Sequence, residues 1–505
     1  MWRLGPDGYG SISSWYQWFS AVGAPGTGFG TWKAPSPSQT RCHFVSISWG
    51  SYFGVIETSS ETKKPLRGEA EGRPARRCRA FLPGLGKKQL LHWDPDTSRV
   101  LELLPESARI EDGELSLGGL RVTELAEEHG TPLLVFCEHT ILSQVRAYRE
   151  AAPGALVVYG TKAFANVALL RLLAEERVGA DVSTLGELAF ARTAGIPGER
   201  IVFHGNNKSE AELRAAAEAG ALVVLDTPVE AEIAAAAGVR RVLVRLTPGV
   251  EAVTHRSIQT AHEESKFGLA PDAAAREVER AGELGLEVEG VHVHVGSQLG
   301  RPDESVLALE RVLGFLERLD WMPPVLDLGG GLGIRHNRNE RLPSVAEFVG
   351  PLVERVPDGV SLILEPGRSL VGRAGMTLYR VGSVKESGGI TYAAIDGGMS
   401  DNPRPQLYGA RYEALLANRA DEPASGVYRI AGKHCESGDV LIEAAELPEP
   451  RPGDLLAVPA TGAYTLALGS TYNGVPRPAV VLVADGTSRL IRRRETVEEL
   501  LRYET

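Results

Sequence analysis

The sequence contains few cysteines. In 505 residues there are four, Cys42, Cys78, Cys137 and Cys435, and none forms a CxxC pair. A disulfide framework and a cysteine-rich metal site are therefore not expected. The sequence also lacks an apolar run long enough to span a bilayer, and its first twenty residues lack the continuous apolar core of a signal peptide. These absences predict a protein of the cytoplasm, without a membrane partner.

The sequence also lacks an excess of basic residues. It has 54 Lys and Arg against 65 Asp and Glu, a formal charge of -11, which argues against a nucleic-acid partner. The hydrophobic content of 43% and the charged content of 24% are typical of a globular protein. The length exceeds that of one ordinary domain and predicts two domains with an appendage.

Residues 1–92 are the expected appendage. They contain Gly- and Pro-rich stretches and show no sustained period of 3.6 or 2. We expect a disordered extension with no assigned role. Upstream sequence included by a misplaced start and an organelle-targeting segment are the alternatives.

Residues 136–372 alternate between apolar runs typical of buried strands and amphipathic segments typical of helices. The eight runs are ALVVYG, ADVS, RIVFHG, ALVVLD, RRVLVRLTP, LEVEGVHVHVG, PVLDLGGG and SLILEPG. This alternation predicts an α/β fold with a (β/α)8 barrel of the TIM type. A doubly wound open sheet is the alternative, because the number of strands does not prove closure.

Residues 373–505 have a different pattern, with strand-like runs separated by turn residues and little helical periodicity. They predict a C-terminal β domain, a sandwich or a barrel. Residues 93–135 share this character in part, so we expect this segment to complete the β domain from the N-terminal side.

Chemically distinctive residues follow four of the predicted strands, and in a (β/α)8 barrel the active site lies at this end of the strands. They are Lys162, His294, Ser297, Gly329, Gly330, Gly331, Glu365, Pro366, Gly367 and Arg368. A partly desolvated lysine with a lowered pKa can form a Schiff base with an aldehyde. Glycine amides can approach a phosphate closely, a carboxylate can hold a ring nitrogen protonated, and an imidazole can stack on a ring. Together these features predict a pyridoxal 5'-phosphate site.

Cys435 stands between His434 and Glu436, with Asp439 four residues on. Its unperturbed pKa lies near neutrality, so the thiol is well populated and can donate a proton. A buried apolar cysteine is the simpler interpretation of such a residue. We favour the proton donor because of the neighbouring ionisable side chains and the resemblance described next.

The chain resembles the fold-type III pyridoxal-phosphate-dependent decarboxylases, with an alanine racemase-like fold, and among them the diaminopimelate decarboxylase family. The similar motifs run in the family's order from about residue 105 to the C-terminus. They are YGTKAFAN, ADVSTLGELAFA, HVHVGSQL, LDLGGGLGI, EPGRSLV, NPRPQLYGA, KHCESGDVL, TGAY and STYNGVPRPAVVLV. The resemblance implies decarboxylation of meso-2,6-diaminopimelate to L-lysine and CO2, the last step of lysine biosynthesis.

The resemblance also implies a role for each matching residue. Lys162 would carry the cofactor, with Asp181 near it, His294 would stack on the ring and Glu365 would pair with the ring nitrogen. Cys435 would be the general acid. The phosphate would be held by Ser297, Gly329, Gly330, Gly331, Gly367 and Tyr464. Pro366 and Arg368 would also contact the cofactor. The substrate would contact Arg368, Arg404, Tyr408, Glu436 and Tyr464. The family's C-terminal segment reaches into a partner's site, which implies a homodimer with composite sites.

Other functions are consistent with part of this pattern. A related decarboxylase of arginine, ornithine or carboxynorspermidine would act on a substrate without a second amino-acid end. An acidic residue in place of Arg404 would favour such a cationic substrate, and the sequence has arginine there. An inactive regulator of the same fold would be expected to have lost Lys162 or Cys435.

Overall fold

The computed structural model describes residues 98–250 and 265–505. The chain divides into two units, Met1–Gln89 and Leu90–Thr505, and the described residues all belong to the second. The extension predicted over residues 1–92 lies outside them. Within the described ranges, no helix is long and apolar enough to cross a membrane.

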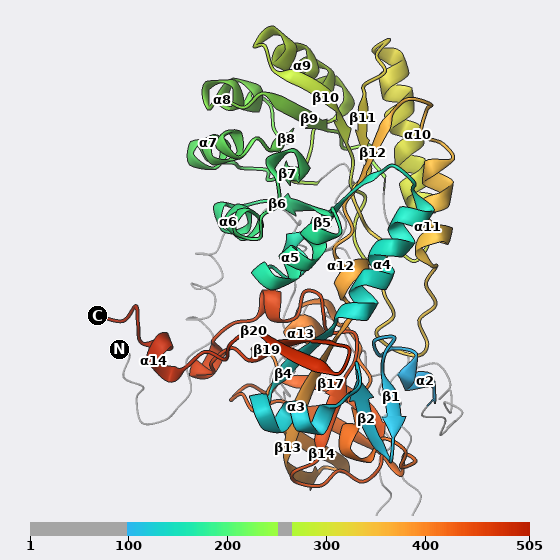
Figure 1. The fold of residues 1–505 in the computed structure, drawn as a ribbon, viewed down its shortest axis with the longest axis vertical. Coiled ribbons are helices and arrows are strands. Elements are labelled where there is room, and N and C mark those ends of the chain that lie inside the picture. The colour runs from blue at the N-terminus through green and yellow to red at the C-terminus, as the bar shows by residue number, and fades with distance from the viewer. Residues whose placement is uncertain (1–97, 251–264) are drawn as a thin grey trace, which may run out of the picture. The chain divides into compact units, whose positions relative to one another are not determined.

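Eight parallel strands close into a barrel (Figure 1). The last strand pairs with the first, with Ile363 opposite Leu156 and Leu364 opposite Val157, so the ring is complete. The predicted (β/α)8 barrel is confirmed and the open sheet is wrong. The strands are β5 (Leu156–Gly160), β6 (Gly179–Val182), β7 (Ile201–Phe203), β8 (Leu222–Leu225), β9 (Arg241–Arg245), β10 (Glu287–His292), β11 (Val325–Asp327) and β12 (Ser361–Leu364).

Helices surround the barrel and bury their apolar faces against it (Figure 1). In α10, for example, Ala308, Val312 and Phe315 are buried at helical spacing. Side chains of Asn166, Thr184, Ser209 and Ser344 cap α5, α6, α7 and α11 by accepting backbone N–H groups. The helices and 3-10 turns of this part are α4 (Glu138–Ala151), η1 (Thr161–Ala163), α5 (Val167–Glu175), α6 (Leu185–Thr193), η2 (Gly198–Arg200), α7 (Glu210–Ala219), α8 (Glu230–Ala236), α9 (Pro271–Glu283), α10 (Asp303–Arg318), α11 (Val345–Val353) and α12 (Arg368–Val371).

A second, mostly antiparallel sheet of nine strands forms a separate part of the fold. The path β17-β16-β14-β13-β4-β19-β20 includes β4, from the segment before the barrel, between β13 and β19. The strands are β4 (Leu133–Cys137), β13 (Gly375–Ser387), β14 (Ile390–Ile395), β15 (Leu415–Leu416), β16 (Gly426–Ala431), β17 (Val440–Leu447), β18 (Leu455–Val458), β19 (Ala479–Ala484) and β20 (Thr487–Arg492).

Shorter elements complete the described chain. A small three-stranded sheet precedes β4, and short helices and turns connect the strands of the large sheet. They are α2 (Ser98–Leu101), β1 (Arg109–Glu111), β2 (Glu114–Leu117), β3 (Leu120–Arg121), α3 (Val122–His129), α13 (Arg404–Tyr408), η4 (Ala417–Arg419), η5 (Leu466–Leu468), η6 (Tyr472–Gly474) and α14 (Val497–Leu500).

Buried aliphatic residues of the barrel strands form a cluster of their own, which includes Val158, Val202, Val224, Leu243 and Ile363. A (β/α)8 barrel is filled by such side chains and is not a pore. Because the lumen is packed, a ligand must bind at the rim. The parallel strands bring their carboxyl ends together at one rim.

Candidate active site

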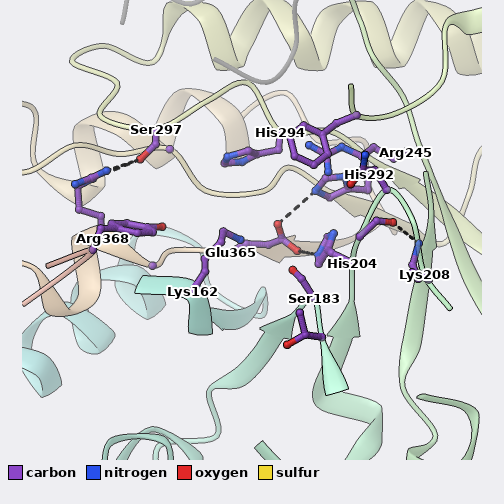
Figure 2. Close-up of a pocket in the computed structure, with 18 of the residues that line it drawn as sticks. Lys162, Ser183, His204, Lys208, Arg245, His292, His294, Ser297, Glu365 and Arg368 are labelled. Carbon is purple, nitrogen blue, oxygen red and sulfur yellow. Dashed lines mark hydrogen bonds and ion pairs between the residues drawn. The ribbon is translucent and has the colours of Figure 1, made fainter. Parts of the chain in front are cut away.

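A cavity of about 520 Å³ lies at the carboxyl ends of the barrel strands. Figure 2 shows its polar side chains converging from different strands. Most residues predicted from the sequence line it: Lys162, His294, Ser297, Gly331, Glu365, Gly367, Arg368, Tyr408 and Tyr464. The predicted residues Asp181, Gly329, Gly330, Pro366, Arg404, Cys435 and Glu436 are not among its lining residues.

Lys162 lies in η1, directly after β5, and half of its side-chain surface is open. Gly160 pairs with Asp181 of β6, so a residue two positions later stands above that carboxylate. The Lys162 Nζ donates a hydrogen bond to Oδ2 of Asp181, which is buried. Desolvation alone lowers the pKa of Lys162, but the charge of Asp181 prevails and raises the pKa above its usual value. The lowered pKa expected from the sequence is therefore wrong.

Glu365 follows β12 and is held between two imidazoles (Figure 2). Nε2 of His204 donates to Oε1 at 2.6 Å, and Nε2 of His292 donates to Oε2 at 3.3 Å. Burial alone raises the pKa of Glu365, but the two imidazoles outweigh it and keep the pKa well below its usual value. Burial lowers the pKa of His292 to about 4. The site thus contains a buried carboxylate that stays ionised.

Asp327, at the end of β11, lies beside this group and is fully buried. Burial and the charge of Glu365 raise its pKa well above the usual range. Ligand-type atoms of Asp327, His204, His292 and Glu365 lie within 4.8 Å of one another, an arrangement that can suit a metal ion. Hydrogen bonds from His204 and His292 to Glu365 account for the closeness of these three groups without an ion, so the cluster alone gives no reason to place a metal there.

His294 follows β10, and its ring is fixed by the glycine run. Nδ1 accepts the backbone N–H of Gly330 at 3.2 Å, so Nε2 carries the proton of the neutral ring. Burial lowers the pKa of His294 well below its usual value, which keeps the ring neutral. A Cβ at Gly329 would lie 2.5 Å from Nδ1, and the φ of this residue is +64°, so only glycine fits.

The amides of the glycine run are partly occupied. The N–H of Gly329 donates to Oδ1 of Asp327 at 2.9 Å, and the N–H of Gly330 donates to His294. Gly331 lines the cavity directly. The carbonyl of Pro366 accepts the N–H of Gly160 at 3.2 Å, which joins the ends of β12 and β5 behind the cavity wall.

Arg368 opens α12 and points toward Ser297 (Figure 2). Its Nη2 donates to Oγ of Ser297 at 3.0 Å, and the guanidinium lies 4.7 Å from the ring centre of Tyr464. The buried Nη1 has no hydrogen-bond partner among the residues that the structure describes. Burial and the charge of Arg404 lower the pKa of Arg368 to about 10. A buried cation with an unused N–H is suited to bind an anion.

Arg404 and Tyr408 both belong to α13, one turn apart. Tyr408 lines the cavity, whereas the guanidinium of Arg404 is buried and donates to Nε2 of His336 at 2.8 Å and to the hydroxyl of Tyr412. Neither acceptor was predicted from the sequence. His336 lies 68 residues before Arg404, and no local pattern links the two.

Cys435 and Glu436 lie in an exposed loop between β16 and β17, away from the cavity of their own chain in the described structure. The loop is ordered by its neighbours: the N–H of Cys435 donates to Oδ1 of Asn473 at 2.8 Å. Buried His434 donates from Nδ1 to Oδ2 of Asp439 at 2.6 Å. The structure therefore presents the predicted proton donor on the surface.

Sequence reasoning also missed charged residues at the ends of other strands. Arg245 ends β9, lines the cavity and donates to Asp226 at 3.2 Å. Lys208 lines it too and donates to buried Glu230 at 2.7 Å. The strand-end rule that selected Lys162 could have found His204, which follows β7, and Arg245.

The comparisons with known proteins agree with this site. Residues 138–372 match the pyridoxal binding domain of pyridoxal-dependent decarboxylases. Diaminopimelate decarboxylase of Actinosynnema pretiosum subsp. auranticum is 45% identical over 425 residues, which cover 80% of this chain and 95% of that protein. Diaminopimelate decarboxylase of Bacillus subtilis is 43% identical over 426 residues, which cover 79% of this chain and 97% of that protein.

Solved structures give the same relationship. A diaminopimelate decarboxylase from M. jannaschii, in complex with L-lysine, has a TM-score of 0.74 and 33% identity, covering 79% of this chain and 98% of that one. The enzyme from Helicobacter pylori, also with L-lysine, has a TM-score of 0.71 and 30% identity, covering 76% and 99%. The similarity therefore extends over nearly the whole length of these relatives.

Proposed function

The chain belongs to the diaminopimelate decarboxylase family of pyridoxal-dependent decarboxylases, and we propose that it converts meso-2,6-diaminopimelate to L-lysine and CO2. The observation that carries the proposal is the 45% identity along 95% of a curated diaminopimelate decarboxylase. The enzyme class is that of a carboxy-lyase with pyridoxal 5'-phosphate as cofactor. A small amino acid is accordingly its partner in the cavity.

The cavity fits this cofactor. Lys162 supplies the amine that binds the aldehyde, and Glu365, which stays ionised, suits a protonated ring nitrogen. Neutral His294 offers its ring for stacking. The phosphate would be held by Ser297, Gly331, Gly367 and Tyr464, which line the cavity together. When bound, the cofactor supplies a ring that accepts the electron density left by departing CO2.

Arg368, Arg404 and Tyr408 would receive the distal carboxylate of the substrate. Arg368 keeps a buried Nη1 without a partner in the described chain, and the charge of Arg404 lies close enough to lower its pKa. Two neighbouring guanidinium groups favour an anion between them. Substrates such as ornithine or arginine end in a cation and would be repelled by the same groups, which supports a substrate with two carboxylates.

Cys435 would be the general acid, and Glu436 would bind the distal ammonium. Both are exposed and absent from the lining of the cavity within the described chain. We therefore propose that Cys435 of the partner subunit completes each site in a homodimer, so that one protomer alone lacks the proton donor. Burial of the thiol between two subunits would also exclude water from the reacting carbon.

The experiment that tests the function is CO2 release with added pyridoxal phosphate. The substrates are meso-diaminopimelate, L-arginine, L-ornithine and carboxynorspermidine, offered to wild type and to Cys435→Ala. Turnover of diaminopimelate alone, lost or misdirected in the variant, is the expected result. Turnover of one of the other three substrates would instead assign the enzyme to a related decarboxylase activity. No turnover of any substrate by the wild type with bound cofactor would instead indicate a regulator.

A further inference from the structure

The guanidinium of Arg404 is held at one side by His336. Arg404 begins α13, whereas His336 lies in the loop between β11 and α11 of the barrel. Nη1 of Arg404 donates both of its hydrogens, one to Nε2 of His336 at 2.8 Å and one to the hydroxyl of Tyr412. Nε and Nη2 therefore form the edge that remains for a ligand, and buried Nε has no hydrogen-bond partner in residues 98–250 and 265–505.

His336 accepts a hydrogen bond from Arg404 through the lone pair of Nε2. A guanidinium only donates, so Nε2 must carry the lone pair and Nδ1 the proton. The ring is buried, and its plane stands at 90° to that of Tyr412 with the centroids 5.5 Å apart. Glu340 accepts the backbone N–H of His336 at 2.6 Å and lies 3.7 Å from Nδ1, which fixes the loop. Both acceptors of Nη1 are thus themselves held in place.

This contact joins the two parts of the fold at the proposed carboxylate site. Arg368 comes from the barrel and Arg404 from the second part, and each has a buried N–H without a partner in the described chain. A carboxylate accepts two parallel N–H bonds from one guanidinium only when the correct edge faces it. Rotation of Arg404 about its side chain would turn the edge formed by Nε and Nη2 away from that carboxylate.

We propose that His336 is a positioning residue that fixes the edge of Arg404 offered to the distal carboxylate of the substrate. The inference rests on the proposed function, because that function assigns the carboxylate to Arg404. His336 does not line the described cavity and acts only through the arginine. It therefore contributes to the selection of substrates with a second carboxylate.

The test compares two ligands that differ in this carboxylate. L-Lysine retains it, and cadaverine lacks it. Each is titrated into the enzyme loaded with pyridoxal phosphate, and binding is followed by the visible absorbance of the cofactor. For His336→Leu we expect the Kd of L-lysine to rise about tenfold or more and that of cadaverine to change less than about twofold. The KM for diaminopimelate should rise more than kcat falls.

Matched variants separate positioning from folding. His336→Gln keeps an acceptor near the place of Nε2 and should restore most of the affinity for L-lysine. Tyr412→Phe removes the other acceptor and should weaken L-lysine in the same direction, so the inference is testable even if His336→Leu folds poorly. His139→Leu makes the same change at an exposed histidine and should leave both ligands unaffected.

Equal weakening of L-lysine and cadaverine in His336→Leu would mean that the histidine only supports packing, and would overturn the inference. Unchanged binding of L-lysine by His336→Leu would overturn the inference as well. In both cases the proposed function would stand if the wild type decarboxylates diaminopimelate. Failure of the wild type to release CO2 from diaminopimelate would overturn both.

Discussion

Lys162 and Asp181 meet at the ends of neighbouring barrel strands, where the ammonium donates a hydrogen bond to a carboxylate that is almost completely buried. A lysine attacks an aldehyde only as the free amine, so a carboxylate that raises its pKa slows capture of the cofactor near neutral pH. The same carboxylate fixes the position of Nζ at the cavity. Asp181 thus lowers the reactivity of the Lys162 amine but holds that amine in a fixed position at the cavity.

Substitution of Asp181 by Asn should lower the pKa of Lys162, because the charge that raises it is removed while the size is kept. We expect the pH midpoint for capture of pyridoxal phosphate to fall by about one unit or more. The measurement is the rate of capture against pH, read from the absorbance of the cofactor. Asp181→Glu retains the charge and should behave more like the wild type; an unmoved midpoint in Asp181→Asn would contradict the assignment.

Substitution of Glu365 by Gln should lower kcat by about 10²-fold or more, because a neutral amide no longer keeps a ring nitrogen protonated. The amide oxygen can still accept from His204, so the local structure should persist. Cofactor retained after gel filtration, measured spectroscopically, controls for loss of binding. A kcat close to that of the wild type with full cofactor content would show that the carboxylate is not needed.

Exposure of Cys435 allows a direct test of composite sites. Lys162→Ala and Cys435→Ala should each be inactive alone, because each lacks one essential group in both sites. After the two variants are unfolded together and refolded, half of the dimers are mixed and each of these holds one complete site. We expect recovery of about a quarter of the wild-type activity, measured as CO2 release. No recovery, despite mixed dimers detected by mass spectrometry, would place Lys162 and Cys435 in the same chain's site.

The barrel could be predicted from the sequence because parallel strands buried on both faces appear as continuous apolar runs, as in Leu222–Leu225. Its closure could not be predicted from the runs alone. Closure depends on the pairing of β12 with β5, whose residues lie about two hundred positions apart. The resemblance to the decarboxylases, which the comparisons confirm, supplied that missing information.

The site was predictable where chemistry and strand ends coincide, as for Lys162 and Glu365. The surroundings that determine the charge of Lys162 and Glu365 could not be predicted from the sequence. The raised pKa of Lys162 comes from Asp181, on the next strand, and the ionised state of Glu365 comes from His204, 161 residues earlier. Such contacts depend on tertiary placement and leave no periodic signal in the sequence.

The buried His336 predicts a dependence of stability on pH that can be isolated by mutation. Burial, together with the charges of Arg404 and Arg368, lowers its pKa to about 4, and Glu340 opposes this shift in part. The unfolded chain binds a proton at this residue near its ordinary pKa of 6.5, so between about pH 6.5 and 4 the unfolded state binds more protons than the native one. The contribution of His336 is therefore fully present above pH 6.5 and is lost as the pH falls toward 4.

The free energy of unfolding should accordingly fall less steeply with acid in His336→Gln than in the wild type. The difference amounts to about 1.4 kcal/mol for each pH unit within the window and to about 3 kcal/mol in total. Urea unfolding of both proteins at pH 7, 6 and 5 measures it, and carboxylates that titrate in both cancel in the difference. His139→Gln, at an exposed position, should follow the wild type. Parallel curves for His336→Gln and the wild type would mean that His336 is protonated in the native protein, which is incompatible with its acceptance of the Arg404 hydrogen bond.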